Sequence, residues 1–234
     1  MAEVVHDVWV YIEQMIPLGL IALAVFLLLC PMRNRRLRRL GLTTSLRREV
    51  VLLLFVAFCA GLAALTLFPA NLWAYVYDWL FRHKTWAVAW DGRSVQSFYP
   101  AWEEISARFA VLPEILTPFE EIRRAVRTSS YWLWFMLLGN IIMFTPIGFF
   151  PALLWRNGRW WKSLLIGFSA SCTVEFIQFF IGRSTDIDDV ILNTAGALAG
   201  FWVFWLLRAI CPKLCKTFQC QPKGGYRNGR FSGN

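Results

Sequence analysis

Long runs of apolar residues, separated by short polar segments, dominate the hydrophobic pattern of the chain. Each run has about 18–25 residues, which at about 1.5 Å per helical residue is enough to cross a hydrocarbon core of about 30 Å. The pattern therefore predicts an all-α, polytopic membrane protein with about five transmembrane helices. The five runs lie at residues 14–32, 50–70, 131–155, 163–182 and 190–207.

A long segment between the second and third runs, residues 71–130, contains shorter stripes of apolar residues at helical spacing. Thr117 and Pro118 fit an N-cap and a first helical position, and Glu120 would close a capping box. We expect two short amphipathic helices on the outer membrane face, with a loosely folded outer cap as the alternative. The first stripe consists of Trp102, Ile105, Phe109 and Leu112.

Charged residues collect between the apolar runs and predict the orientation in the membrane. Residues 31–49 carry seven arginines against one glutamate, and the loop 155–162 adds three basic residues. Residues 208–234 carry six more basic residues, whereas residues 1–13 hold three acidic residues and no lysine or arginine. Since basic loops stay on the cytoplasmic side, we expect a multi-pass membrane protein with its N-terminus outside and its C-terminus in the cytoplasm.

Composition agrees with a membrane protein, because 57% of the residues are hydrophobic and only 17% are charged. The net charge of +9 does not indicate a nucleic-acid partner, since the basic residues form short clusters between spans and no nucleic-acid motif is present. The expected organisation has four parts. They are an N-terminal anchor helix with a basic cytoplasmic loop (1–49), the second span with the outward segment (50–130), a core of three spans (131–210) and a basic cytoplasmic tail (211–234).

Polar residues form one stripe in the fourth run and another at the start of the fifth. Residues three or four apart lie on one face of a helix, so the two stripes could face each other. An ionisable residue within a span is costly and by default marks a functional site, which singles out Glu175. The stripes are Ser171, Glu175 and Gln178 in the fourth run and Asp186, Asp189 and Asn193 in the next helix.

Structural roles are the alternative for each of these residues. The aspartates could cap the fifth helix, amides such as Asn140 in the third run could join helices, and Arg183 could pair with Glu175 or with an aspartate. Gly196 and Gly200 form a small-residue pair, for which Gly167 and Ser171 of the fourth run offer a matching edge.

Several carboxylates beside amide oxygens suit two kinds of chemistry. They could hold a hard divalent cation such as Mg²⁺ or Ca²⁺, or they could supply a general acid–base pair that includes Glu175. The sequence does not separate a metal-bound from a metal-free site. The catalytic candidates are Glu175, Asp186 and Asp189, and the candidates for substrate binding are Asn140, Gln178, Arg183 and Asn193.

Three motifs follow one another in the last three runs. They are Asn140-Ile-Ile-Met-Phe-Thr-Pro-Ile-Gly148, Glu175-Phe-Ile-Gln178 and Asp186-Ile-Asp-Asp-Val-Ile-Leu-Asn193. In this order, and over about residues 115–205, they resemble the VanZ-like family. The resemblance implies a small bacterial membrane protein of the cell envelope; the founding member is associated with resistance to teicoplanin, a lipid-tailed glycopeptide antibiotic.

Three functional hypotheses follow, and they leave open whether the chain is an enzyme. The first is a binding protein whose polar pocket in the outer leaflet holds the head group of an amphiphile, which would reduce the action of lipoglycopeptides. The second is a membrane enzyme that modifies or hydrolyses a lipid-linked head group, with Glu175 as acid–base. The third is an ion-coupled transporter. The expected partners are membrane lipids or a lipid-linked envelope precursor, with a lipoglycopeptide antibiotic as a further candidate.

Overall fold

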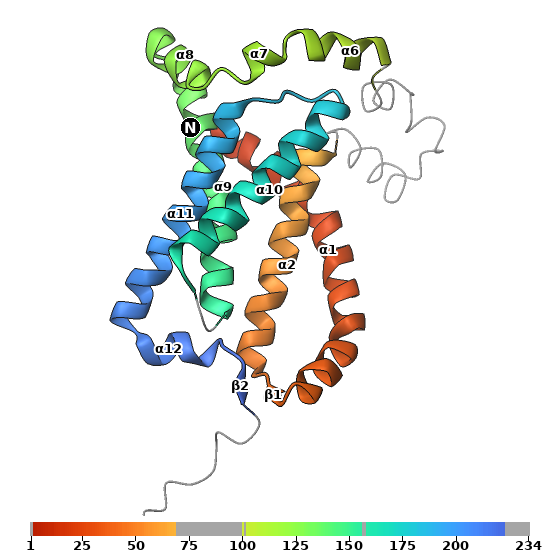
Figure 1. The fold of residues 1–234 in the computed structure, drawn as a ribbon, viewed down its shortest axis with the longest axis vertical. Coiled ribbons are helices and arrows are strands. Elements are labelled where there is room, and N and C mark those ends of the chain that lie inside the picture. The colour runs from red at the N-terminus through yellow and green to blue at the C-terminus, as the bar shows by residue number, and fades with distance from the viewer. Residues whose placement is uncertain (1, 69–99, 101, 156–157, 223–234) are drawn as a thin grey trace, which may run out of the picture.

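The computed structural model describes residues 2–68, 100, 102–155 and 158–222 (Figure 1). Much of the expected outward segment and the end of the tail, residues 223–234, therefore lie outside the described residues. Five helices are long and apolar enough to cross a membrane, which confirms the five predicted spans. They are α1 (Ala2–Arg39), α2 (Leu46–Leu67), α9 (Tyr131–Leu154), α10 (Trp160–Phe180) and α11 (Ile187–Ile210).

Short elements cover the two ends of this bundle (Figure 1). At one end, called the α8 end, lie α6 (Trp102–Ala110), α7 (Leu112–Ile115) and α8 (Glu120–Thr128). At the other, called the α12 end, lie α12 (Pro212–Thr217) and an antiparallel pair of two-residue strands, β1 (Leu42–Thr43) and β2 (Gln221–Pro222). Apart from this pair, the regular secondary structure of the described residues consists of helices, as predicted. The basic end of α1, the basic start of α10 and the lysines of α12 all lie at the α12 end (Figure 1).

The closest helix packing joins α9 and α11, and small residues make it possible. A Cβ atom on Gly196 would lie 2.3 Å from the carbonyl oxygen of Ile141, and one on Gly200 would lie 1.9 Å from that of Thr145. The pair therefore faces α9. The sequence had suggested instead that it faces the fourth span, which is α10. Gly167 of α10 instead meets Ala197, on another face of α11.

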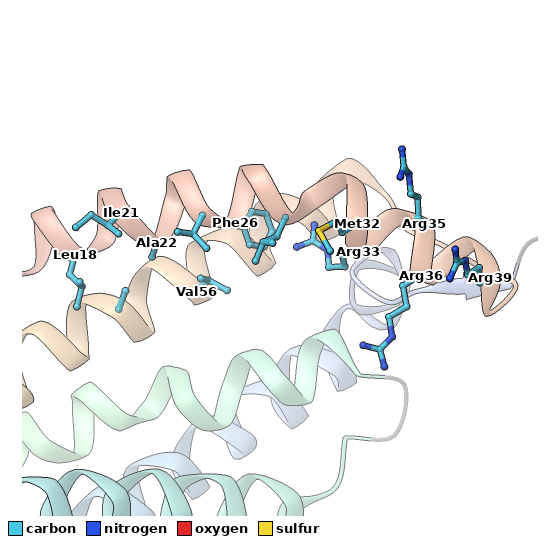
Figure 2. Close-up of a pocket in the computed structure, with 13 residues that line it drawn as sticks. Leu18, Ile21, Ala22, Phe26, Met32, Arg33, Arg35, Arg36, Arg39 and Val56 are labelled. Atoms are coloured by element: carbon cyan, nitrogen blue, oxygen red, sulfur yellow. The ribbon is translucent and has the colours of Figure 1, made fainter.

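The first helix packs mainly along α2 and leaves much of its own surface open. The predicted basic loop over 31–49 is largely helical, because α1 continues through the arginines, which are good helix formers, to Arg39. It ends before Gly41, whose φ of 69° is a left-handed conformation that glycine adopts without strain. Beside α1 lies a groove with an apolar part and a row of arginines (Figure 2).

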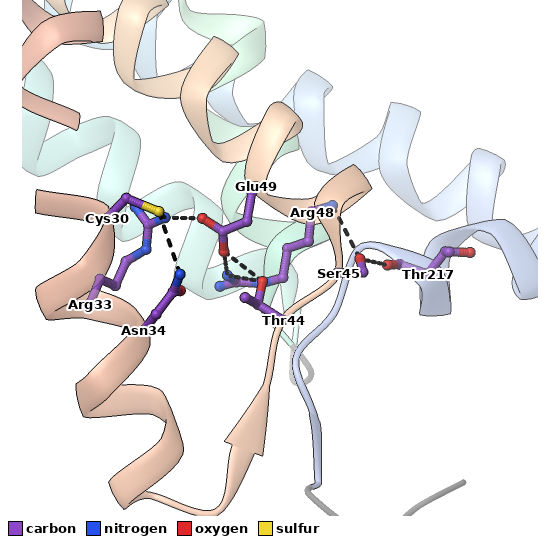
Figure 3. A network of polar contacts seen from close by, with 8 residues as sticks. All are labelled: Cys30, Arg33, Asn34, Thr44, Ser45, Arg48, Glu49 and Thr217. Atoms are coloured by element: carbon purple, nitrogen blue, oxygen red, sulfur yellow. Dashed lines mark hydrogen bonds and ion pairs between the residues drawn. The ribbon is translucent and has the colours of Figure 1, made fainter. Parts of the chain in front are cut away.

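A network of polar contacts holds the α1–α2 connection at the α12 end (Figure 3). Glu49 of α2 pairs with Arg33 of α1 and, at 3.4 Å, with Arg48. The Ser45 hydroxyl caps α2 by accepting from the amide of Arg48 and donates at 3.0 Å to the carbonyl of Thr217. This network, together with the strand pair, fixes α12 to the start of α2.

Candidate functional site: polar groups at the α8 end

Glu175 lies on α10 near the α8 end and is 7% exposed. Its Oε2 accepts a hydrogen bond of 3.1 Å from the backbone amide of Asp186, eleven residues later in the chain. Among the described residues, no hydrogen bond or ion pair reaches Oε1. The bond ties α10 to the start of α11 and leaves half of the carboxylate available to another group.

Asp186 and Asp189 stand at the start of α11, where both are half-buried. Asp186 is the N-cap residue of α11, because its Oδ1 accepts from the amide of Asp188 at 2.9 Å. Asp189 accepts a hydrogen bond from the side-chain amide of Asn140 on α9. The structure thus brings Asn140, Glu175, Asp186 and Asp189 to the junction of α9, α10 and α11, and we call these four residues the acidic constellation.

Asn193 lies one turn deeper in the bundle and takes a structural position. Its Nδ2 donates to the Ser171 hydroxyl at 2.9 Å, and Ser171 is fully buried. This pair joins α10 to α11, which agrees with a structural role for Asn193, the alternative to a role in substrate binding. The other amide atom, Oδ1 of Asn193, is buried without a partner within the described chain.

Gln178 and Arg183 both point to the end of α2 rather than to the acidic constellation. The side-chain amide of Gln178 donates to the carbonyl of Thr66 at 2.9 Å, and the guanidinium of Arg183 donates to that of Phe68 at 2.8 Å. Arg183 forms no ion pair with a carboxylate in the part of the chain that the structure describes. Burial lowers the pKa of Arg183 from its usual value. Both residues satisfy carbonyl groups that the end of a helix leaves free.

The role of Asp188 could not be read from the sequence. Its side chain is fully buried, and its two oxygens accept from the backbone amides of Phe119 and Glu121 at the start of α8. The predicted N-cap, Thr117, is wrong: the N-cap position is Phe119, and the Thr117 hydroxyl donates to the carbonyl of Pro113 instead. The carboxylate of Asp188, which comes from α11, replaces the local cap.

Arg108 of α6 is a second residue that the sequence did not single out. Its guanidinium donates to the carbonyls of Phe179 at 2.9 Å and Arg183 at 2.7 Å, and it also lies over the ring of Phe179. Arg108 therefore caps the C-terminus of α10 and holds α6 against it. No local signal marks this arginine, because its partners are backbone carbonyls about seventy residues away.

Below α8, an apolar cluster closes the side of the acidic constellation. Ala125 of α8 is fully buried and packs with Leu137 of α9 and Leu192 of α11. Asp188 and this cluster together keep α8 at the edge of the site. The carboxyl groups of the acidic constellation therefore lie between a packed helix junction and a short amphipathic helix.

The acidic constellation carries three carboxyl groups, and no lysine or arginine among the described residues bonds to any of them. Burial raises the pKa of Asp186, and the neighbouring carboxylates of Asp188 and Glu121 also raise it, against the smaller lowering effects of the backbone amide of Asp188 and of Arg124. No group of three acidic, histidine or cysteine side chains within the described ranges could hold a metal ion. The arrangement therefore offers hydrogen-bond acceptors to a ligand.

Comparison with protein families matches residues 55–208 to the VanZ/LLP1 family. A search of curated proteins and a search of solved structures gave no significant match. The match begins within α2 and includes residues 71–115, which the sequence motifs alone had left outside the resemblance. Residues 1–54 and 209–234 lie outside the match. Since the match covers well over half of the chain, including α9, α10, nearly all of α11, the second part of α2 and all of the acidic constellation, the chain belongs to the VanZ/LLP1 family of multi-pass membrane proteins.

Proposed function

We propose that the protein binds the polar head group of an envelope amphiphile at the α8 end, with the acidic constellation as the recognition surface. The observation that carries this proposal is that no hydrogen bond or ion pair joins Glu175, Asp186 or Asp189 to a basic side chain among the described residues. The carboxyl oxygens of these residues accept hydrogen bonds, so a ligand that supplies donors fits them. Hydroxyl, amide and ammonium groups of a sugar- or peptide-bearing head group meet that requirement.

The depth of the site supports binding near a membrane surface. Glu175 lies five residues before the end of α10, and Asp189 lies two residues after the start of α11. At about 1.5 Å per residue, both lie within roughly 8 Å of the helix ends. This is the region where the polar head of an amphiphile meets its hydrocarbon tail.

The orientation follows from charge. The basic residues at the end of α1, the start of α10 and on α12 belong on the cytoplasmic side by the positive-inside rule. The α8 end then faces outward, and the acidic constellation lies in the outer leaflet. A lipid-tailed glycopeptide or a lipid-linked envelope precursor would reach it there, which connects the site with resistance to teicoplanin.

One observation supports a second candidate, a membrane enzyme that modifies a lipid-linked head group. The carboxylate of Glu175 is held by one backbone amide, so one of its oxygens is free to exchange a proton with a bound substrate. In this case Glu175 is the acid–base group, and Asp189, positioned by Asn140, orients the head group.

The test compares wild type, E175Q, D189N and the control E104Q, which changes an exposed residue of α6, at matched membrane levels in a host without the protein. Susceptibility to teicoplanin and to vancomycin, which lacks the lipid tail, is measured side by side. We expect wild type and E104Q to protect selectively against teicoplanin, and E175Q and D189N to protect less.

Each contrary outcome has its own meaning. Equal protection by all four proteins would show that the acidic constellation is structural. No protection by wild type would remove the link to teicoplanin. Purified protein incubated with envelope lipids and followed by mass spectrometry separates the two candidates, because an enzyme yields a product that E175Q does not make, whereas a binder retains lipid unchanged.

A further inference from the structure

The groove beside α1 combines an apolar wall with a basic end. It has a volume of about 1100 Å³ and lies along α1, with Val56 and Ala60 of α2 on its other side. This is at or above the upper end of the range of about 300–1,000 Å³ for small-molecule sites. An occupant that fills it is therefore large. Its α1 residues are Leu18, Ile21, Ala22, Val25, Phe26, Leu29, Met32, Arg33, Arg35, Arg36 and Arg39.

The apolar part fits hydrocarbon chains. From Leu18 to Met32 the wall rises by about 21 Å, which exceeds the depth of one leaflet, about 15 Å. Several of its side chains are open, and Met32, the last before the arginines, is 66% exposed. No other described helix covers this face, because α1 packs mainly on α2.

The basic end of the groove contains one arginine that pairs within the protein and three that do not pair with any described residue. Arg33 pairs with Glu49 and lies over the ring of Phe26, so it belongs to the network at the start of α2 (Figure 3). Arg35, Arg36 and Arg39 are exposed, and no hydrogen bond or ion pair joins them to the described residues. Figure 2 shows Arg36 directed from α1 toward the neighbouring helices, at the end of the apolar wall, whereas Arg35 extends to the opposite side of α1.

We propose that this groove binds a glycerophospholipid with an anionic head group, whose phosphate lies on Arg36 and Arg39, with Arg35 adding positive charge at the same end, and whose acyl chains lie along α1. Arginine forms paired hydrogen bonds with phosphate oxygens, which makes it suited to this head group. Charge complementarity at the basic end selects an anionic lipid over a zwitterionic one. The site lies at the α12 end, opposite the acidic constellation, and does not depend on the function proposed there.

Arg38 provides a matched control within the same helix. It is exposed, carries the same charge and lies in the same last turn of α1, but it does not line the groove. A general effect of basic residues on the helix end or on membrane orientation would involve Arg38 as well. A lipid site in the groove would not.

The experiment uses the full-length protein in detergent with added phosphatidylglycerol, phosphatidylcholine or inorganic phosphate. Native mass spectrometry records retained lipid and oligomeric state for wild type, R35Q/R36Q/R39Q and R38Q. We expect wild type and R38Q to retain phosphatidylglycerol over phosphatidylcholine, and the triple variant to lose at least about tenfold in retention. Phosphate alone should compete weakly, because it lacks the chains.

Three outcomes would overturn the proposal. They are equal retention of the two lipids by wild type, a loss in R38Q as large as in the triple variant, and a lipid-free dimer, which would assign the groove to a second copy of the chain. A tryptophan fluorescence spectrum checks that the triple variant is folded. If it is not folded, R36Q alone is compared with R38Q, and R36Q should then retain less phosphatidylglycerol.

Discussion

The carboxylate of Asp188 accepts a hydrogen bond of 2.9 Å from the backbone amide of Glu121, so the start of α11 caps the start of α8. The same carboxylate also accepts from the amide of Phe119, whose φ of 68° would be unfavourable without support. The position of the short helix beside the acidic constellation is therefore set by an aspartate that belongs to a family motif. This cap accounts for the presence of an aspartate at position 188 and requires no direct role for it in binding a ligand.

Replacement of Asp188 by alanine should loosen α8 while the spanning helices remain folded. Loss of an N-cap acceptor costs about 0.5–2 kcal/mol, and two amides lose their partner here. Hydrogen exchange at residues 119–123 should become about 5–30-fold faster, as measured by mass spectrometry in detergent. The control E104Q changes an exposed residue of α6 and should leave exchange at residues 119–123 as in wild type; an unchanged rate in D188A would refute this role.

Replacement of Gly200 by alanine should destabilise the contact between α9 and α11. The added Cβ would lie 1.9 Å from a backbone carbonyl oxygen, which has no room to move without shifting the helix. Overpacking of this kind costs about 1–3 kcal/mol. Thermal unfolding in detergent, followed by tryptophan fluorescence, should show a lower midpoint for G200A. The matched control is G139A on α9, where nothing lies within 4 Å of the added carbon, and its midpoint should not fall.

Replacement of Ser171 by alanine should lower stability because it leaves the buried side-chain amide of Asn193 without its acceptor. An unsatisfied buried donor costs about 1–3 kcal/mol. The loss should be visible in the same unfolding measurement, while protection against teicoplanin per folded molecule should persist. S169A, at an exposed position of α10, serves as the control. If S171A were as stable as S169A, Asn193 would not be an interhelical contact.

Replacement of Asp186 by asparagine should stabilise the protein at neutral pH relative to acidic pH. Burial raises the pKa of Asp186 in the folded state, so folding favours its protonated form. Its contribution is therefore present below the unfolded pKa of about 3.9 and is lost as pH rises through the folded pKa. Asparagine keeps the N-cap acceptor and does not ionise.

The difference in unfolding midpoint, D186N minus wild type, should accordingly increase as the pH is raised from about 3.5 to 7. Comparing the two proteins at each pH cancels the titration of the other carboxylates. A difference that stays constant with pH, or one that decreases, would contradict the expected direction.

The length of the apolar runs was enough to predict the five spans, because a single apolar segment of about 20 residues satisfies its own backbone across a hydrocarbon core only as a helix. Helical spacing likewise predicted that Glu175 and Asp189 would lie on polar faces, and the structure places both at the same junction. The basic cluster was predicted as a loop. This was largely wrong, because charge alone does not end a helix. The helix continues to the residues before Gly41, where the backbone turns.

Spacing along a helix determines which residues share a face, but not which neighbour that face meets. The sequence therefore indicated the polar stripes, the small-residue pair and the membrane-spanning lengths by itself. Only the tertiary structure decided that Gly196 and Gly200 face α9, that Gln178 serves α2 and that Asp188 serves α8. The physical reason is that these partners are backbone carbonyls and amides of distant segments. Every residue carries such groups, so they leave no mark in the sequence.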